Sequence, residues 1–212
     1  RLKMAKTEKQ KIAGTCVACQ RSFSHSELAK HLEHCGSRNQ TSEVSRKEKP
    51  FKVFHLLIEG TWGRNYFLHV NAAASAKLSD LDSFLRNIWL ECCGHLSLFE
   101  IEGEKYSSSP DEEFDDKTMN IPLYEVLRPK LKFGYEYDFG STTELTLHVI
   151  SENQGVLKKK IELLARNDIP KIPCGKCGKP ATEICAGCAG EKEEMLLPFV
   201  NSPRAGVCGY TG

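Results

Sequence analysis

Ten cysteines stand out in this chain of 212 residues, because most of them fall in short, closely spaced groups. The first group joins a C-x-x-C turn to a histidine and a cysteine four residues apart, namely Cys16, Cys19, His31 and Cys35. Residues four apart on a helix lie on one face, so His31 and Cys35 can reach one ion together. Three thiolates and an imidazole are typical of tetrahedral zinc. The spacing therefore predicts a structural zinc site.

The second group consists of two C-x-x-C pairs near the C-terminus, formed by Cys174, Cys177, Cys185 and Cys188. Four thiolates leave no open coordination position, which again favours a structural zinc ion. An alternative pairs two of these cysteines with Cys208 and a further ligand. The short separation is similar to the first half of an interleaved two-zinc module found in some protein-binding fingers. We therefore expect two zinc ions in the chain.

The segment between the first ligands predicts a short helix. Ser24 followed by Glu27 has the spacing of a capping box, which places the helix start at about His25. Phe23 and Leu28 are the bulky apolar residues available for a miniature core. So small a segment cannot bury enough surface to fold alone, and a bound zinc ion would supply the missing free energy.

This segment resembles a zinc finger with a Cys-Cys-His-Cys ligand set. The phenylalanine and leucine stand where DNA-binding fingers place theirs, but one residue closer together. The shorter spacing is similar to that of the ubiquitin-binding fingers of eukaryotic DNA-repair proteins. If the finger did read DNA, Ser24, Glu27 and Lys30 would occupy the base-facing helix positions. A structural or protein-contact role for the helix is the alternative.

Charge is divided unevenly along the chain, although the net charge of the whole is only +1. Residues 1–50 carry 11 Lys and Arg against 5 Asp and Glu, whereas residues 51–165 carry 12 against 18. A basic arm beside an acidic body indicates regions with different roles. A basic arm attracts nucleic acid, and a merely solvated tail is the alternative.

The chemistry of the cysteines also bears on the compartment. No export signal is seen, and C-x-x-C pairs with a nearby histidine favour metal over disulfides, so we expect a cytoplasmic protein. No apolar run is long enough to cross a bilayer, so no membrane contact is expected. Cys92 and Cys93 lie on or beside the apolar face of a predicted helix that Ser79 caps. An adjacent pair chelates a metal poorly, and we interpret both as small buried hydrophobes.

The elements that must position these sites are clearest between Leu131 and Ile150. Apolar residues alternate on both arms of this stretch, with Gly and Ser at the bend, which predicts an antiparallel hairpin. We expect one side of the hairpin to pack inward, through Tyr135, Tyr137, Phe139, Leu145, Leu147 and Val149. Further strands are predicted at 51–59, 65–70, 96–101 and 156–164, and helices after Ser79 and at 119–128.

These elements predict an α+β fold with a mixed, mostly antiparallel sheet and two or three helices, flanked by two small zinc modules. The expected organisation is a basic tail at 1–13, a zinc finger at 14–36, a linker at 37–50, the α+β domain at 51–166 and a Cys-rich segment at 167–212.

The α+β body resembles the Ri-plasmid ORF-3-like domain family, also known as insertion-sequence passenger proteins of the TnpR type. The residues that carry the resemblance are Trp89, His95-Leu96 with Phe99, and the run from Tyr137 to Gly140. Many members continue this run with two acids, a Trp and a His, where this chain has Ser141 to Leu145. The resemblance implies a compact α+β domain of unestablished activity, with a link to mobile elements.

The sequence shows no catalytic constellation, such as a Gly-rich phosphate loop, G-x-S-x-G or H-E-x-x-H. His55, His69 and His148 lie in predicted strands and are interpreted as ordinary core or surface histidines. Closed metal sites leave no position for metal-assisted hydrolysis. We therefore expect a non-enzymatic protein without a small-molecule substrate.

Three functions remain to be compared. The basic arm beside a finger favours a zinc-binding, nucleic-acid-associated protein. The alternative is a protein-interaction adaptor that presents its zinc modules to a partner. The third is an enzyme with an unrecognised site, which would require a polar pocket near Asp138 and His148.

Overall fold

The computed structural model describes residues 13–40, 49–61, 65–90, 94–111, 113, 115–169, 183–185 and 196–198, with the backbone alone for 36–40 and the last two ranges. Within this part the chain forms a ten-stranded mixed sheet and three α-helices, together with a separate two-stranded sheet. The predicted α+β class is confirmed. In the described part, no helix is long and apolar enough to cross a bilayer.

The large sheet has the strand order β2-β1-β10-β4-β3-β9-β8-β5-β6-β7, and its strands pair antiparallel except for β6 with β7. Its strands are β1 (Ala13–Cys16), β2 (Ser22–Ser24), β3 (Phe51–Gly60), β4 (Phe67–Ala73), β5 (Ser97–Ile101), β6 (Glu104–Ser107), β7 (Lys117–Thr118), β8 (Lys132–Tyr137), β9 (Thr143–Gly155) and β10 (Ile161–Asn167). The small sheet joins β11 (Glu183–Cys185) to β12 (Leu196–Pro198).

The predicted hairpin is present as β8 and β9, which pair in the register Tyr135 opposite Leu145. The residues expected to face inward are buried, with one exception. Phe139 is 48% exposed. The prediction for Phe139 is wrong because β8 ends at Tyr137 and Asp138 takes a left-handed backbone conformation with φ of 62°. That turn of the chain breaks the alternation on which the prediction depended.

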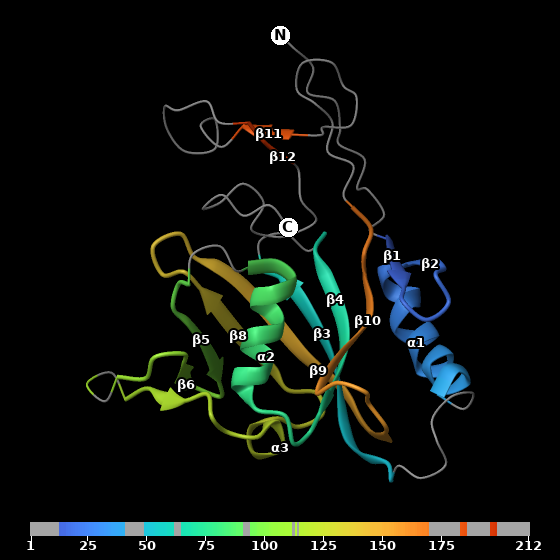
Figure 1. Ribbon diagram of the computed structural model, residues 1–212, viewed down its shortest axis with the longest axis horizontal. Helices are drawn as coiled ribbons and strands as arrows, with labels where there is room; N and C mark the ends of the chain where they lie inside the picture. Colours follow the sequence, from blue (N-terminus) through green and yellow to red (C-terminus); the bar gives the residue numbers. More distant parts are fainter. Residues whose placement is uncertain are drawn as a thin grey trace.

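One face of the sheet is covered by α2 (Leu78–Leu85), which continues as a π-helical turn over Arg86–Leu90 (Figure 1). The helix is capped by Lys77 rather than by Ser79, two residues earlier than expected, because the Asp80 carboxylate accepts a hydrogen bond from the Lys77 N–H at 2.9 Å. A short helix, α3 (Leu123–Val126), lies at the lower end in Figure 1. Trp89 is fully buried in the main core beneath these elements.

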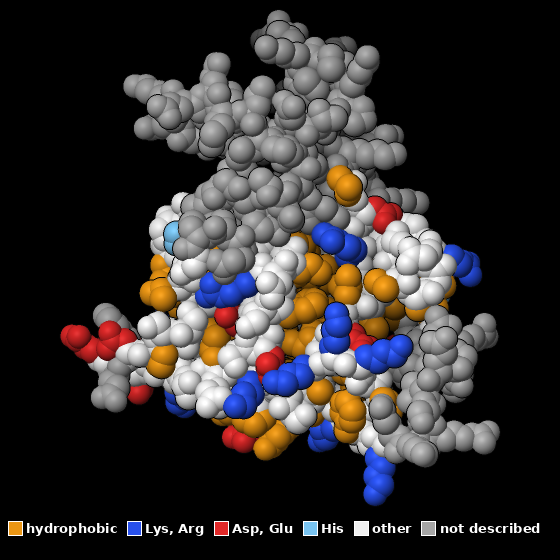
Figure 2. Space-filling model, in the orientation of Figure 1, with side chains coloured by type: hydrophobic (Ala, Val, Ile, Leu, Met, Phe, Trp, Pro, Cys, Tyr) orange, Lys and Arg blue, Asp and Glu red, His pale blue; other side chains and the backbone are white. Residues whose placement is uncertain are grey.

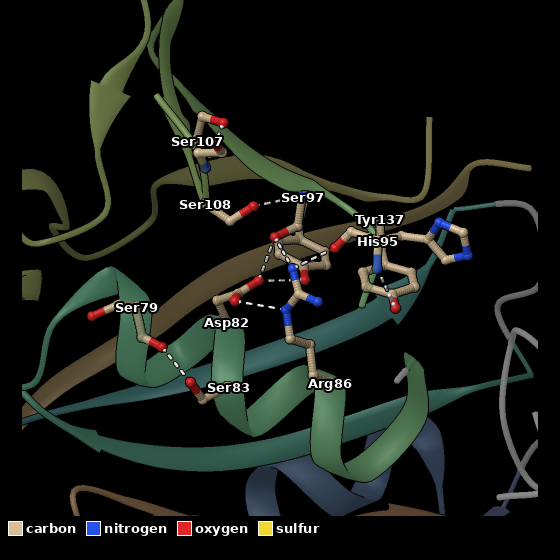
Figure 3. A network of polar contacts seen from close by, with 11 residues as sticks. Ser79, Asp82, Ser83, Arg86, His95, Ser97, Ser107, Ser108 and Tyr137 are labelled. Atoms are coloured by element: carbon tan, nitrogen blue, oxygen red, sulfur yellow. Dashed lines mark hydrogen bonds and ion pairs between the residues drawn. The ribbon is translucent and has the colours of Figure 1, made fainter. Parts of the chain in front are cut away.

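A buried polar network ties α2 to the sheet (Figure 3). The Asp82 carboxylate, 7% exposed, accepts hydrogen bonds from Tyr135 Oη at 2.7 Å and Ser97 Oγ at 2.6 Å, and pairs with Arg86 Nε at 2.8 Å. Arg86 Nη2 also donates to the carbonyl oxygen of His95 at 2.8 Å. Both buried charges are therefore compensated by several partners. The same contacts fix the helix against the sheet.

The opposite face is covered at one end by α1 (His25–Gln40). Leu28 and Leu32 of this helix pack against Leu57, Phe67 and Ala165 of the sheet, in a small core separate from the main one. The predicted finger core of Phe23 and Leu28 is therefore completed by the sheet. Leu32 was not anticipated.

The segment predicted as a finger is also an extension of the sheet. β1 pairs with β10 in the register Gly14 opposite Asn167 and Cys16 opposite Ala165, and β2 then pairs with β1. The Val17 N–H donates to the Leu164 carbonyl at 2.8 Å and continues this contact into the turn. Figure 1 shows β1, β2 and α1 together at the β10 side of the sheet. We call β1, β2 and α1 the metal module.

Figure 2 shows the surface of the face that carries α2. Apolar side chains are visible between α2 and the metal module, with Lys and Arg side chains beside them. The ammonium group of Lys160 pairs with the Asp80 carboxylate of α2 at 2.9 Å. This ion pair joins the residue just before β10 to the helix.

Close packing at Gly14 supplies a test of this docking. A Cβ atom there would lie 2.7 Å from the Phe67 ring and 2.8 Å from the Arg166 carbonyl oxygen. We predict that Gly14→Ala lowers the free energy of unfolding by about 1–3 kcal/mol, since the backbone must shift to relieve the overlap. Urea denaturation measures the change. Gly134→Ala in β8 is the matched control, because a Cβ atom at that position would have nothing within 4 Å. Equal effects of the two substitutions would contradict the prediction.

Candidate metal centre

The structure brings the side chains of Cys16, Cys19, His31 and Cys35 together. One ligand atom from each lies within 4.8 Å of the other three. Cys16 Sγ is 3.9 Å from Cys35 Sγ, and Cys19 Sγ is 3.3 Å from His31 Nε2. The edges of a tetrahedral zinc site measure about 3.8 Å between sulfurs and about 3.5 Å between sulfur and nitrogen, given the usual bond lengths. The group therefore has the size of a tetrahedral metal site.

A tight turn after β1 presents the first two thiols. The Gln20 N–H donates to the Cys16 carbonyl at 2.9 Å, and Gln20 itself has a φ of 57°. A hydrogen bond from the backbone N–H of Arg21 lowers the pKa of the Cys19 thiol, whereas burial raises the pKa of the Cys35 thiol to about 11. A thiol must lose its proton to bind a metal, so a cation at this centre favours thiolates that burial alone would disfavour.

The imidazole of His31 is held by an aromatic stack. Its ring lies 3.9 Å from the Phe23 ring, centroid to centroid, at an interplanar angle of 25°. The guanidinium of Arg21 lies over the Phe23 ring at 5.3 Å from its centroid. Burial, and then the charge of Arg21, lower the pKa of His31. A neutral imidazole is the form that binds metals, so this environment suits a ligand.

The predicted helix start is confirmed, because α1 begins at His25. The Ser24 N–H donates to the Glu27 carboxylate at 3.2 Å, and Ser24 Oγ donates to the same oxygen. Of the three residues expected to contact bases, Glu27 and Lys30 are exposed, whereas Ser24 is half-buried. Ser24 and Glu27 are thus occupied with each other, which is a reason against base reading by these two side chains.

Beneath α1 lies a pair of histidines that the sequence indicated only as ordinary core or surface residues. His55 is 6% exposed and His69 is 1% exposed, and His55 Nε2 lies 3.0 Å from His69 Nδ1. Burial lowers the pKa of His55 to about 4, and burial together with the nearby His55 and His25 lowers the pKa of His69 to about 3. Both rings are therefore neutral at physiological pH.

Two more histidines meet a carboxylate beside this pair. His25 Nε2 lies 3.5 Å from one oxygen of Glu59, and His148 Nε2 lies 3.7 Å from the other. The His25 ring also packs edge-on against Phe67, at 4.5 Å between centroids. The first turn of α1 thus contacts the sheet through a polar group as well as through the small core. Strand pairing brings these residues together, and no local sequence pattern predicts that pairing.

The two residues proposed for an enzyme pocket, Asp138 and His148, contact different partners. The Asp138 carboxylate accepts hydrogen bonds from the backbone N–H groups of Gly140 and Ser141, at 3.1 and 3.3 Å. It lies 3.6 Å from His95 Nδ1, whereas His148 faces Glu59. The carboxylate of the Tyr-Asp-Phe-Gly run is therefore occupied in shaping its own turn.

Several predicted residues lie outside the part of the chain whose side chains are described. These are Cys92, Cys93, Cys174, Cys177, Cys188 and Cys208. Cys185 ends β11, where only the backbone is described. The second predicted zinc site stays a prediction, and among the described side chains the Cys16 group is the one that gathers metal ligands.

Comparisons with known proteins give little further guidance. No protein-family model matches the chain, and no curated protein matches it. Among solved structures, it is similar to a protein of unknown function from Methanosarcina mazei Go1, with 14% identity and a TM-score of 0.46. That match covers 56% of this chain and 68% of the other. So distant a likeness carries no argument about function.

The buried histidine pair predicts a loss of stability in acid. Its folded-state pKa values lie below the ordinary value of 6.5, so the unfolded chain binds more protons. The stability contributed above pH 6.5 is lost as the pH falls towards 4. We expect the free energy of unfolding to drop by about 1–3 kcal/mol between about pH 7.5 and pH 5 because of these groups.

The measurement is urea denaturation across this range at fixed zinc concentration. Acid also protonates the metal ligands, so the informative quantity is the difference between the wild type and His55→Gln/His69→Gln. The double variant should lose stability less steeply with falling pH. His34→Gln, at an exposed position of α1, is the control and should follow the wild type. Identical pH slopes for wild type and double variant would exclude the pair as the cause.

Proposed function

We propose that this chain is a zinc-binding, non-enzymatic binding protein. In this proposal, Cys16, Cys19, His31 and Cys35 hold one zinc ion with no open coordination position. The ion has a structural role, in which it fixes the turn after β1 to α1. A second ion is proposed for Cys174, Cys177, Cys185 and Cys188.

The observation that carries this proposal is the convergence of four ligand atoms within 4.8 Å at the joint between β1 and α1. Three of the four side chains are partly exposed and the fourth, Cys16, is fully buried in the core shared with the sheet. A metal there closes the loop between two elements that both contact the sheet. The free energy of metal binding then also stabilises the packing of the metal module against the sheet.

Metal content per chain tests the proposal. We expect about two zinc ions in the wild type by elemental analysis, and one fewer in Cys16→Ser, because a hydroxyl is a poor replacement for a thiolate. Val17→Ser is the control, since Val17 is 45% exposed and is not a member of the ligand group. A variant Cys16→Ser that keeps the wild-type metal content would refute this centre, and a wild type without metal would refute both.

Nucleic-acid association is the second candidate function. It is favoured by the excess of Lys and Arg in residues 1–50, which carry 11 basic against 5 acidic residues. The surface of α1 itself has mixed charge, from Glu27, Lys30 and Glu33. We therefore propose that any contact is made by basic side chains on phosphate groups, without sequence reading. A link to mobile elements, through the resemblance to the Ri-plasmid family, is part of the same proposal.

The salt dependence of binding tests this candidate. Full-length protein should retard a short DNA duplex or single strand at low salt, and the affinity should fall by about a factor of ten or more when the salt is raised from about 50 to about 200 mM. Lys3→Gln/Lys6→Gln/Lys9→Gln should weaken the binding, whereas Lys158→Gln/Lys159→Gln, just before β10, is the control. Absence of any shift at low salt with excess nucleic acid would eliminate this function.

A further inference from the structure

A carboxylate at the end of β10 contacts both strands of the metal module. Asp168 follows β10 directly, and its backbone N–H donates to the Ala13 carbonyl at 2.9 Å. Each oxygen of its carboxylate accepts a hydrogen bond, one from Thr15 Oγ1 at 2.6 Å and the other from Ser22 Oγ at 2.7 Å. Thr15 and Ser22 are cross-strand partners in the register of β1 and β2. We call these three side chains the Asp168 clasp.

The clasp and the metal ligands lie on opposite faces of the hairpin that β1 and β2 form. Successive side chains of a strand point to opposite faces, so Thr15 points away from the face of its neighbour Cys16. Cys16 is fully buried in the small core under α1, and Phe23 stacks on the ring of His31. Ser22, the neighbour of Phe23, is exposed. The clasp therefore holds from behind the same two strands that carry or contact the ligands in front.

The short strand β2 gains most from this contact. It has three residues and is the outermost strand of the described sheet, next to β1. The hydrogen bond from Ser22 Oγ to Asp168 joins β2 directly to the end of β10, which lies beyond β1 in the strand order. Hydrogen bonds to a carboxylate are stronger than those between neutral groups. The clasp thus fixes β2 relative to the sheet as well as to β1.

The position of this hairpin determines where three of the four ligands stand. The turn after β1 presents the thiols of Cys16 and Cys19, and Phe23 of β2 holds the imidazole of His31. A site whose ligands are already in place binds its metal more tightly, because fewer side chains and less backbone must be ordered upon binding. Groups that orient the ligands without touching the metal therefore influence metal affinity.

We propose that Asp168 is a positioning residue of the metal centre, and that it raises the zinc affinity of this centre from the opposite face of the hairpin. It acts through the hydroxyl groups of Thr15 and Ser22 rather than through a ligand. The proposal deepens the function proposed above and rests on it, since it requires a metal ion at the Cys16 group.

Protection of a thiol from alkylation tests this role in the full-length protein. Zinc bound at the centre should shield the half-buried Cys35 from iodoacetamide, and trypsin releases Cys35 in the peptide 31–38, apart from the other cysteines. Asp168→Asn and Thr15→Val should raise the free zinc concentration for half protection by about three- to tenfold, less than the loss typical when a group that contacts a ligand is removed. Thr15→Ser keeps the hydroxyl and should behave as the wild type.

Matched controls separate positioning from general stability. Asp115→Asn removes the same charge from an exposed position elsewhere and should leave the half-protection concentration unchanged. A merely structural role would lower the urea midpoint of the zinc-free protein without changing that concentration. This result, or a Thr15→Ser variant that binds zinc as weakly as Thr15→Val, would overturn the proposal. A wild type in which zinc never protects Cys35 would refute the metal centre itself, whereas equal protection of wild type and Asp168→Asn would refute this role alone.

Discussion

The pairing of β1 with β10 is the contact on which the arrangement of this protein depends. It places Cys16 opposite Ala165, at the edge of a sheet whose other strands come from residues 51–167. Once β1 is fixed there, the turn after it and α1 can lie only where Leu28 and Leu32 meet the sheet. A metal centre of four side chains, which would otherwise stabilise a segment too small to fold alone, thereby becomes part of a larger folding unit.

Polar groups are buried on both faces of the sheet, but they differ in how many hydrogen-bond partners they have. On the α2 side, Asp82 has three partners, so its charge is compensated where it is buried. On the α1 side, His55 and His69 have mainly each other, and His69 Nε2 has no hydrogen-bond partner among the described residues. The first network fixes a helix firmly through charge. The second is a pair of neutral rings, because burial lowers the pKa of both histidines.

The two faces of the sheet also differ in what they leave open. One has α2 and a core that includes the fully buried Trp89 and Tyr137. Their burial gives them a packing role in this chain. The other face has α1 at one end and carboxylates at the other, where Glu136 and Glu144 are not compensated by any described cation. The four side chains that could hold a metal ion therefore lie on the face that α1 covers in part.

Local patterns in the sequence determined much of this structure. Alternation of apolar residues located β8 and β9, and ligand spacing together with the Ser24 and Glu27 pair located the metal group and the start of α1. These signals depend on neighbours within a few residues, so they survive without knowledge of the fold. The exposed position of Phe139 was missed because a single left-handed residue, Asp138, interrupts the alternation.

Only the tertiary structure decided what those elements meet. The union of β1 with β10, the burial of His55 against His69 and the opposition of Glu136 to Glu144 all depend on strand register. The first two join residues that are distant in the chain. Register is set by packing and hydrogen bonding over the whole sheet, and a shift by one residue would move each of these side chains to the other face. The sequence therefore specified which side chains could bind a metal ion. The fold specified which strands and core residues lie beside them.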